Sequence, residues 1–261
     1  MKKLFFLLTG IFFLINHSNA QDTSLYAKHV FVRDKDSLPY RLLLPLNFDV
    51  HKKYPLILFL HGSGERGNDN EKQLAHGGDL FLTDSIRKHY PAIVVFPQCS
   101  AQSSWTNLSS HFDSTLNKRI IEFKEDGEPT RAMKLLLDLI RNLEDSYPLD
   151  KKRMYVGGLS MGGMGTFELV RRKPGTFAAA FAICGGANVA SAGRINKTAW
   201  WIFHGLKDPV VDPQFSKDMA DALKKEGADV KLTLYPEDGH DSWDDAFKEP
   251  DLFQWMFSHK K

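Results

Sequence analysis

Apolar runs recur along most of the chain and predict strands. An antiparallel pair is predicted by "AKHVFVR" and "PYRLLLP", which flank the polar turn "DKDS". Two near-continuous apolar runs follow, "YPLILFLHG" and "YPAIVVFPQ", as is typical of strands covered on both faces. Four more strands are predicted by "RMYVGGLS", "FAAAFAICGG", "TAWWIFHG" and "VKLTLYP".

Between these runs the spacing of apolar residues changes to that of helices. One helix is predicted to begin near Pro129, with apolar residues from Met133 to Leu143 on one face. Others follow "RMYVGGLS" as far as Lys173 and occupy about Gln214–Glu226 and Pro250–Ser258. This alternation predicts the α/β class, with a mostly parallel sheet of about eight strands and helices on both faces.

The first twenty residues have a pattern of their own. They carry two lysines, then an apolar run from Leu4 to Ile15, and they end in small residues up to Ala20. This predicts a secretory signal peptide over residues 1–20, and hence an exported protein, periplasmic or extracellular. A membrane anchor is disfavoured because the apolar run is shorter than the ~20 residues of a bilayer span. The remainder, 21–261, is long enough for one sizeable α/β domain and is predicted to form a single domain.

Charge and cysteine content restrict the partners. Without the leader's two lysines, the chain has 32 basic and 32 acidic side chains, so neither nucleic acid nor an anionic membrane is expected as a partner.

Cys99 and Cys184 are the only cysteines, and neither a metal nor a cofactor is expected. The usual strand order places them three strands apart, about 14 Å at ~4.8 Å per strand. A disulfide needs Cα atoms within about 7 Å, so both thiols are predicted to be free.

The segment "YVGGLSMGGMGTFELV" contains the candidate nucleophile. Gly158-Leu159-Ser160-Met161-Gly162 fits G-x-S-x-G, with a predicted strand before it and a helix after it. In this sharp turn the serine has a strained backbone, and side chains two residues to either side would collide with neighbouring backbone. The turn lifts the hydroxyl of Ser160 out of the sheet and directs a helix N-terminus at the reacting oxygen. A glycine-rich turn beside a buried strand is the alternative interpretation.

A serine hydroxyl needs a base, and the base needs an orienting carboxylate. In open α/β sheets ligands bind at the carboxyl ends of the strands. Asp208 lies in "LKDPVV" just after one strand, and His240 lies in "EDGHDSW" after the last strand. The order Ser160, Asp208, His240 is that of α/β-hydrolases and predicts a catalytic triad.

Other residues compete for the roles of base and acid. His61 and His204 end their strands in His-Gly pairs, positions that more often brace a loop. The remaining candidates lie in loops: the histidines are His76 and His111, and the carboxylates are Asp212, the main rival to Asp208, with Asp238 and Asp241 beside His240.

The segment "FLHGSGERGNDN" predicts an oxyanion hole. A glycine-rich loop directly after a strand lets backbone N–H groups approach a ligand closely. The N–H of Ser63 is expected to pair with that of Met161 around the oxyanion. A phosphate-binding loop is disfavoured because the Gly-Lys-Ser/Thr ending is missing. Glu65 and Arg66 are expected to brace this loop, pairing with each other or with residues 68–70.

Secreted α/β-hydrolase esterases contain segments similar to six in this chain: "LILFLHGSGERG", "PQCSAQSSW", "YVGGLSMGGMGTFEL", "FAAAFAICGG", "FHGLKDPVV" and "YPEDGHDSW". The chain resembles the group that includes polyhydroxybutyrate depolymerase-like proteins and feruloyl or acetyl-xylan esterases, with distant ties to prolyl oligopeptidases and dienelactone hydrolases. The resemblance spans about Lys28 to Ser258. It implies Ser160 as nucleophile, His240 as base and Asp208 as its partner. Dienelactone hydrolases use a cysteine where this chain has serine, which argues against their chemistry.

The loops give an indication of the substrate. Trp105 and Trp243 could flank the serine and offer flat surfaces to an aromatic acyl group or a sugar; the alternative is that both are half-buried loop anchors. The segment 103–126 is polar, aperiodic and long for a connection, as lids and binding loops are. It is too polar for the hydrophobic lid of a lipase.

These features predict a secreted serine carboxylic-ester hydrolase that acts through an acyl-enzyme. The expected substrates are small-molecule or oligosaccharide esters with short or aromatic acyl groups, such as those decorating plant polysaccharides. Three alternatives remain: a general short-chain carboxylesterase, a serine peptidase of the prolyl oligopeptidase type, and an inactive binding protein on a hydrolase scaffold. The complete set of Ser160, Asp208 and His240 disfavours the last.

Overall fold

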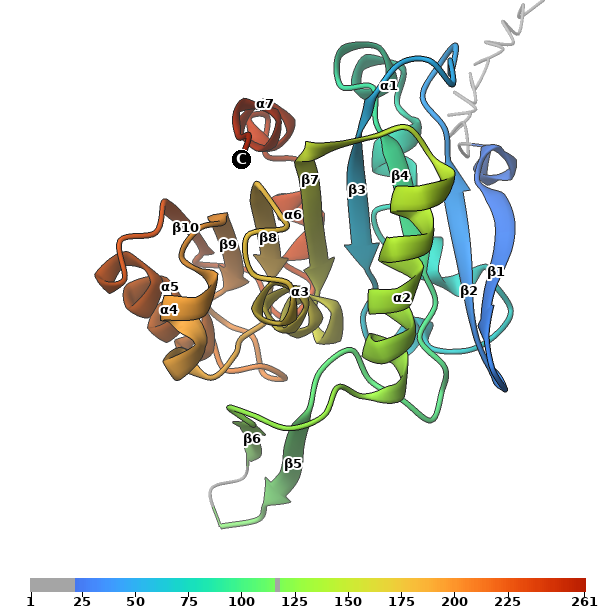
Figure 1. The fold of residues 1–261 in the computed structure, drawn as a ribbon. Coiled ribbons are helices and arrows are strands. Elements are labelled where there is room, and N and C mark those ends of the chain that lie inside the picture. The colour runs from blue at the N-terminus through green and yellow to red at the C-terminus, as the bar shows by residue number, and fades with distance from the viewer. Residues whose placement is uncertain (1–21, 116–117) are drawn as a thin grey trace, which may run out of the picture.

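A mixed sheet forms the centre of the molecule in this computed structural model, which describes residues 22–115 and 118–261 (Figure 1). The predicted signal peptide, residues 1–20, lies outside the described residues. The strands are β1 (Ala27–Arg33), β2 (Asp36–Leu43), β3 (Tyr54–Leu60), β4 (Ile93–Pro97), β7 (Leu149–Leu159), β8 (Ala179–Ile183), β9 (Ala199–Gly205) and β10 (Val230–Tyr235). Their order across the sheet is β1-β2-β4-β3-β7-β8-β9-β10.

The sheet is antiparallel at one edge and parallel elsewhere. β1 pairs with β2 and β2 with β4 in antiparallel register, and every other neighbouring pair is parallel. The parallel strands therefore end at one edge, toward the bottom of Figure 1. This confirms the predicted α/β-hydrolase fold with a mostly parallel sheet of eight strands.

Helices cover both faces of the sheet (Figure 1). The apolar residues of α2 (Arg131–Ser146), α3 (Met161–Arg172), α4 (Ala192–Ile195) and α5 (Gln214–Lys225) share one core cluster. Those of α1 (Asp84–His89), α6 (Trp243–Ala246) and α7 (Leu252–Ser258) belong to the other. β3 supplies both, because alternate side chains of a strand point to opposite faces: Leu58 lies in the first cluster and Phe59 in the second.

The segment 103–126 is more regular than the sequence predicted. It contains an antiparallel hairpin of β5 (Leu108–Asp113) and β6 (Lys118–Phe123), which extends beyond the edge where the parallel strands end (Figure 1). Phe123 anchors its base, with its ring centroid 5.2 Å from that of Phe215 on α5. The prediction of an aperiodic loop was wrong, because β5 is mostly exposed and neither strand has the regular alternation of apolar residues that reveals a half-buried strand.

Two further observations concern the cysteines and the helices. Cys99 and Cys184 are both free, as predicted, and buried; they follow β4 and β8, which are separated by β3 and β7. Burial raises the pKa of the Cys99 thiol to about 12. Of the helices in the described ranges, none has the length and apolar character needed to cross a membrane.

Candidate active site

The candidate nucleophile lies at the turn between β7 and α3. Ser160 has φ 52°, a left-handed conformation that costs energy for any residue except glycine. The turn leaves no space for side chains around it: a Cβ on Gly162 would lie 1.8 Å from the carbonyl oxygen of Leu60. A Cβ on Gly158 would lie 2.5 Å from the carbonyl oxygen of Gly162. These contacts explain why glycines flank the serine.

Three side chains from three loops meet at this turn. The Oγ of Ser160 lies 2.9 Å from Nε2 of His240, and Nδ1 of His240 lies 2.7 Å from Oδ2 of Asp208. Both distances are those of hydrogen bonds. The Asp208 side chain is fully buried, whereas 21% of the His240 side chain is exposed. The bond to Asp208 places the Nδ1 proton, so the Nε2 lone pair of His240 faces the serine hydroxyl.

Asp208 is held ionised by its hydrogen bonds. Burial by itself would raise the pKa of this carboxyl, but hydrogen bonds from His204, His240 and the amides of Val211 and Val210 outweigh it. Oδ1 accepts from the Val210 amide at 2.8 Å and the Val211 amide at 3.0 Å. The pKa of Asp208 therefore lies well below its usual range, and the carboxylate is charged wherever His240 would act as a base.

His204 is a second histidine on the same carboxylate. Its ring is fully buried, and its Nε2 lies 3.2 Å from Oδ2 of Asp208 and 3.0 Å from the carbonyl oxygen of Val211. Both partners are acceptors, so Nε2 must carry a proton. Its Nδ1 lies 2.7 Å from Oγ of Ser216 on α5. Sequence reasoning treated His204 as a loop brace or a rival base, and missed its contact with Asp208, although its place four residues before Asp208 was visible.

The other rivals lie elsewhere. His61 is buried, which lowers its pKa to about 4, and its Nε2 accepts the Cys99 amide at 2.9 Å, so it braces two loops as a neutral ring. Asp212 accepts the amide of Gln214 at 2.9 Å at the start of α5. His76 faces Glu65, and His111 lies on β5 of the hairpin.

Two backbone amides, those of Met161 and Ser63, belong to segments beside the candidate nucleophile. Met161 is the first residue of α3, so its N–H has no acceptor within the helix. Ser63 begins a short 3-10 helix, Ser63–Glu65, directly after Gly62. A Cβ on Gly62 would lie 3.7 Å from the Cβ of Ser160, so this loop passes close beside the serine. The arrangement suits the expected oxyanion hole of Ser63 and Met161.

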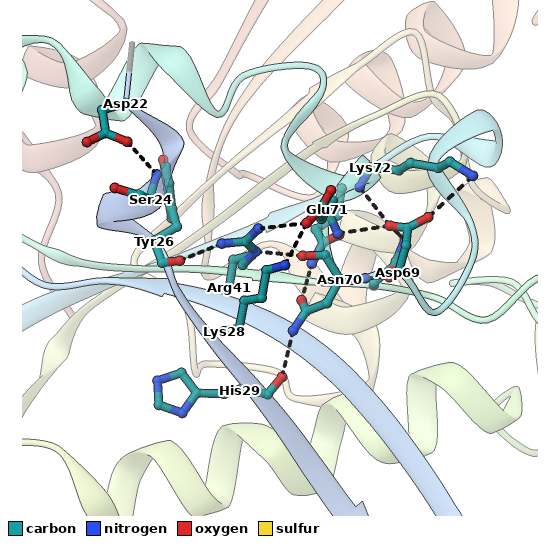
Figure 2. A network of polar contacts seen from close by, with 12 residues as sticks. Asp22, Ser24, Tyr26, Lys28, His29, Arg41, Asp69, Asn70, Glu71 and Lys72 are labelled. Carbon is teal, nitrogen blue, oxygen red and sulfur yellow. Dashed lines mark hydrogen bonds and ion pairs between the residues drawn. The ribbon is translucent and has the colours of Figure 1, made fainter.

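Buried polar contacts fix the loop that carries Ser63. Gln98, fully buried after β4, donates to the carbonyl oxygen of Glu65 at 3.1 Å and accepts the Asn70 amide at 2.7 Å. Arg41 on β2 donates to the carbonyl oxygens of Asn70 at 2.6 Å and Tyr26 at 2.7 Å. Figure 2 shows how this network joins the segment around Asn70 to β1 and β2.

A family model described as phospholipase/carboxylesterase matches residues 49–253. The chain belongs to this family. The matched residues include Ser160, Asp208 and His240.

Individual carboxylesterase relatives are more distant. A bifunctional acetylxylan esterase/xylanase of Neocallimastix patriciarum is 24% identical over 65% of this chain and 28% of its own length. A probable feruloyl esterase C of Aspergillus oryzae is 25% identical over 66% of this chain and 55% of its own length. The chain thus spans about half or less of these two relatives.

Solved structures share the fold. A thermostable esterase superposes with a TM-score of 0.81 at 32% identity, over 92% of this chain and 64% of that chain. A ferulic acid esterase from Anaeromyces mucronatus, in complex with ferulic acid, has a TM-score of 0.62 at 16% identity, over 85% of this chain and 87% of that chain.

Trp105 was expected to offer a flat surface to the substrate, but its position in the structure rules this out. Its side chain is fully buried, its Nε1 donates to the carbonyl oxygen of His61 at 3.1 Å, and it fills the space beside Gly165. Trp105 therefore cannot offer a surface to a substrate, and that prediction was wrong. Trp243 is half-buried, and its ring lies 5.5 Å from the ring of His240.

Cys184 is a further neighbour of the site. Its Sγ, a carboxylate oxygen of Asp208 and a ring nitrogen of His240 lie within 4.8 Å of one another, the spacing of possible metal ligands. The hydrogen bond between Asp208 and His240 already occupies two of these groups. Burial raises the pKa of the Cys184 thiol, so the thiolate that a metal requires is disfavoured.

Proposed function

We propose that the protein is a secreted serine carboxylic-ester hydrolase in which Ser160, His240 and Asp208 form the catalytic triad. The observation that carries the proposal is the chain of two hydrogen bonds from Ser160 through His240 to Asp208. The family, and relatives named as feruloyl and acetylxylan esterases, support ester bonds as the target. Secretion rests on the leader sequence.

The reaction follows from the roles of these atoms. His240 Nε2 takes the proton of Ser160 as Oγ bonds to the ester carbonyl carbon, and the amides of Met161 and Ser63 hold the oxyanion. Collapse of this intermediate breaks the bond to the alcohol oxygen, which receives the proton from His240 and leaves. Water then attacks the acyl-enzyme with His240 again as base, and the acid is released with Ser160 restored. Asp208 stays ionised and stabilises the imidazolium.

The proposed acyl groups are short or aromatic. The segment 103–126 is largely polar in sequence, and its strand β5 is mostly exposed, so it offers little apolar cover for a long alkyl chain. Trp243 beside His240 provides one aromatic surface against which a planar acid or a sugar could pack. Esters that decorate plant polysaccharides combine these properties.

The test is hydrolysis of p-nitrophenyl acetate, methyl ferulate and a matched anilide by wild-type protein and Ser160→Ala. We expect ester turnover that falls at least ~10³-fold in the variant, because triad members act as a unit. Labelling by a fluorophosphonate should be lost in parallel. A variant that kept a tenth of wild-type kcat would remove Ser160 from the mechanism. Preference for the anilide would instead identify a peptidase.

A further inference from the structure

Glu65 places a carboxylate beside the candidate nucleophile. A Cβ on Gly62 would lie 3.0 Å from Oε2 of Glu65 and 3.7 Å from Cβ of Ser160, so those two atoms are less than about 7 Å apart. Only 13% of the Glu65 side chain is exposed. The carboxylate thus lies on the loop that is proposed to hold the oxyanion, and within reach of a bound ester.

A carboxylate at this place has an electrostatic cost. A negative charge near a developing oxyanion opposes it, and partial burial strengthens the repulsion. The carboxylate faces Nε2 of His76 at 3.7 Å, which is too long for a hydrogen bond. Carboxylate oxygens accept strong hydrogen bonds from O–H donors, and such donors would offset the cost. The arrangement therefore suits a ligand that brings hydroxyl groups.

Glu65, His76 and Trp243 form a continuous row of side chains, called the wall below, that extends from the candidate nucleophile to His240. The ring centroid of His76 lies 5.1 Å from that of Trp243, and Trp243 lies edge-on to His240 at 5.5 Å. His240 must deliver its proton to the leaving alcohol oxygen, so the alcohol half of the ester lies beside His240. The wall of Glu65, His76 and Trp243 consequently borders the alcohol and combines a carboxylate, an imidazole and an aromatic surface.

The position of Glu65 is fixed by its loop. Gln98 holds the Glu65 carbonyl oxygen, the Gly67 amide donates to the carbonyl oxygen of Cys99 at 2.9 Å, and Nε of Arg66 donates to the carbonyl oxygen of Ser63 at 3.0 Å. The buried contacts of Arg41 anchor the next turn (Figure 2). These contacts fix the backbone around Glu65, which limits the positions that its carboxylate can take beside the candidate nucleophile.

We propose that Glu65, with His76 and Trp243, forms the subsite for the alcohol half of the ester, and that Glu65 selects alcohols with several hydroxyl groups, such as a sugar. This inference rests on the proposed esterase function. The carboxylate accepts hydrogen bonds from sugar hydroxyls while Trp243 packs against the apolar face of the ring.

The experiment compares three esters of one acid, acetate or ferulate, with methanol, a pentose and choline as the alcohols. We expect wild-type protein to prefer the pentose ester. Glu65→Gln, which keeps the shape but removes the charge, should lower the ratio of kcat/KM for the pentose ester over the methyl ester about tenfold, because hydrogen bonds to charged groups are the strong ones. Glu71→Gln, a matched change six residues on at a 64% exposed side chain, should leave the ratio unchanged.

Each contrary outcome is distinct. An equal loss for the methyl and pentose esters in Glu65→Gln would mean that Glu65 only positions the oxyanion loop, and would overturn the subsite. A choline ester preferred by wild type and lost in Glu65→Gln would overturn the sugar in favour of a cationic alcohol. Absence of turnover with all three esters would contradict the esterase itself. In that case NMR binding of a methyl pentoside to Ser160→Ala, with and without Glu65→Gln, still tests the subsite: equal binding refutes it.

Discussion

At the residue scale, the most informative side chain outside the proposed triad is His204. It contacts Oδ2 of Asp208, the same oxygen that His240 uses, so it positions the acid without reaching the substrate. We expect His204→Leu to lower kcat for p-nitrophenyl acetate about tenfold with little change in KM, since a hydrogen bond to a charged group is lost. His204→Gln can restore an N–H donor and should recover part of this loss. Equal kcat values for the Leu variant and wild type would refute the role.

The depressed pKa of Asp208 predicts a pH dependence of stability. Because the folded-state pKa lies below the unfolded value of 3.8, the ionised group favours the folded state above that value, and this contribution disappears as the pH falls toward the folded pKa. We therefore expect Asp208→Asn to show a smaller fall in the free energy of unfolding than wild type below about pH 4. Urea unfolding between pH 6 and the acid limit of solubility would measure it. Parallel curves for both proteins would contradict the assignment.

At the element scale, the turn from β7 into α3 is the least tolerant part of the fold. A Cβ on Gly162 would lie 1.8 Å from the carbonyl oxygen of Leu60, whereas a Cβ on Gly64 would meet nothing within 4 Å. We expect Gly162→Ala to destabilise the protein by at least ~2 kcal/mol, because the packed backbone of β3 must move. Gly64→Ala is the matched control and should unfold at the wild-type temperature. Thermal unfolding of both proteins is the measurement, and equal midpoints would contradict the packing argument.

Sequence patterns predicted elements with strong apolar periodicity and missed those without it. Strands β2, β3, β4, β7, β8 and β9 were evident because their burial makes them apolar. β1 is as exposed as β5, but the polar turn "DKDS" that joins it to β2 revealed it, whereas β5 and β6 offered no such signal. The same limit applies within the site. Ser160, Asp208 and His240 follow recognisable turns, but the burial of Trp105 against Gly165 depends on a contact between residues sixty positions apart. No local pattern encodes such a contact.

At the scale of the whole molecule, the shape of the site predicts the range of acyl chains. In a groove that buried every methylene of the acyl chain, each added carbon would stabilise the bound ester and its transition state by about 0.8 kcal/mol. This would raise kcat/KM roughly fourfold per carbon. Because the segment 103–126, which extends beyond the sheet edge, is largely polar, we expect the gain to stop by about four carbons. A p-nitrophenyl ester series from acetate to palmitate tests this, with methyl ferulate alongside. Peak activity at eight or more carbons would identify a lipase.

The sequence separation within the proposed triad has a consequence for how activity arises during folding. Ser160 and His240 are 80 residues apart, and Asp208 comes from a third loop between them. The two strands that precede Asp208 and His240, β9 and β10, close the far edge of the sheet. A chain that has folded only as far as β8 would already have a nucleophile elbow but neither base nor acid. Recovery of hydrolysis on refolding should therefore lag behind recovery of secondary structure. The length of the lag would report how slowly the last third of the chain packs onto the sheet.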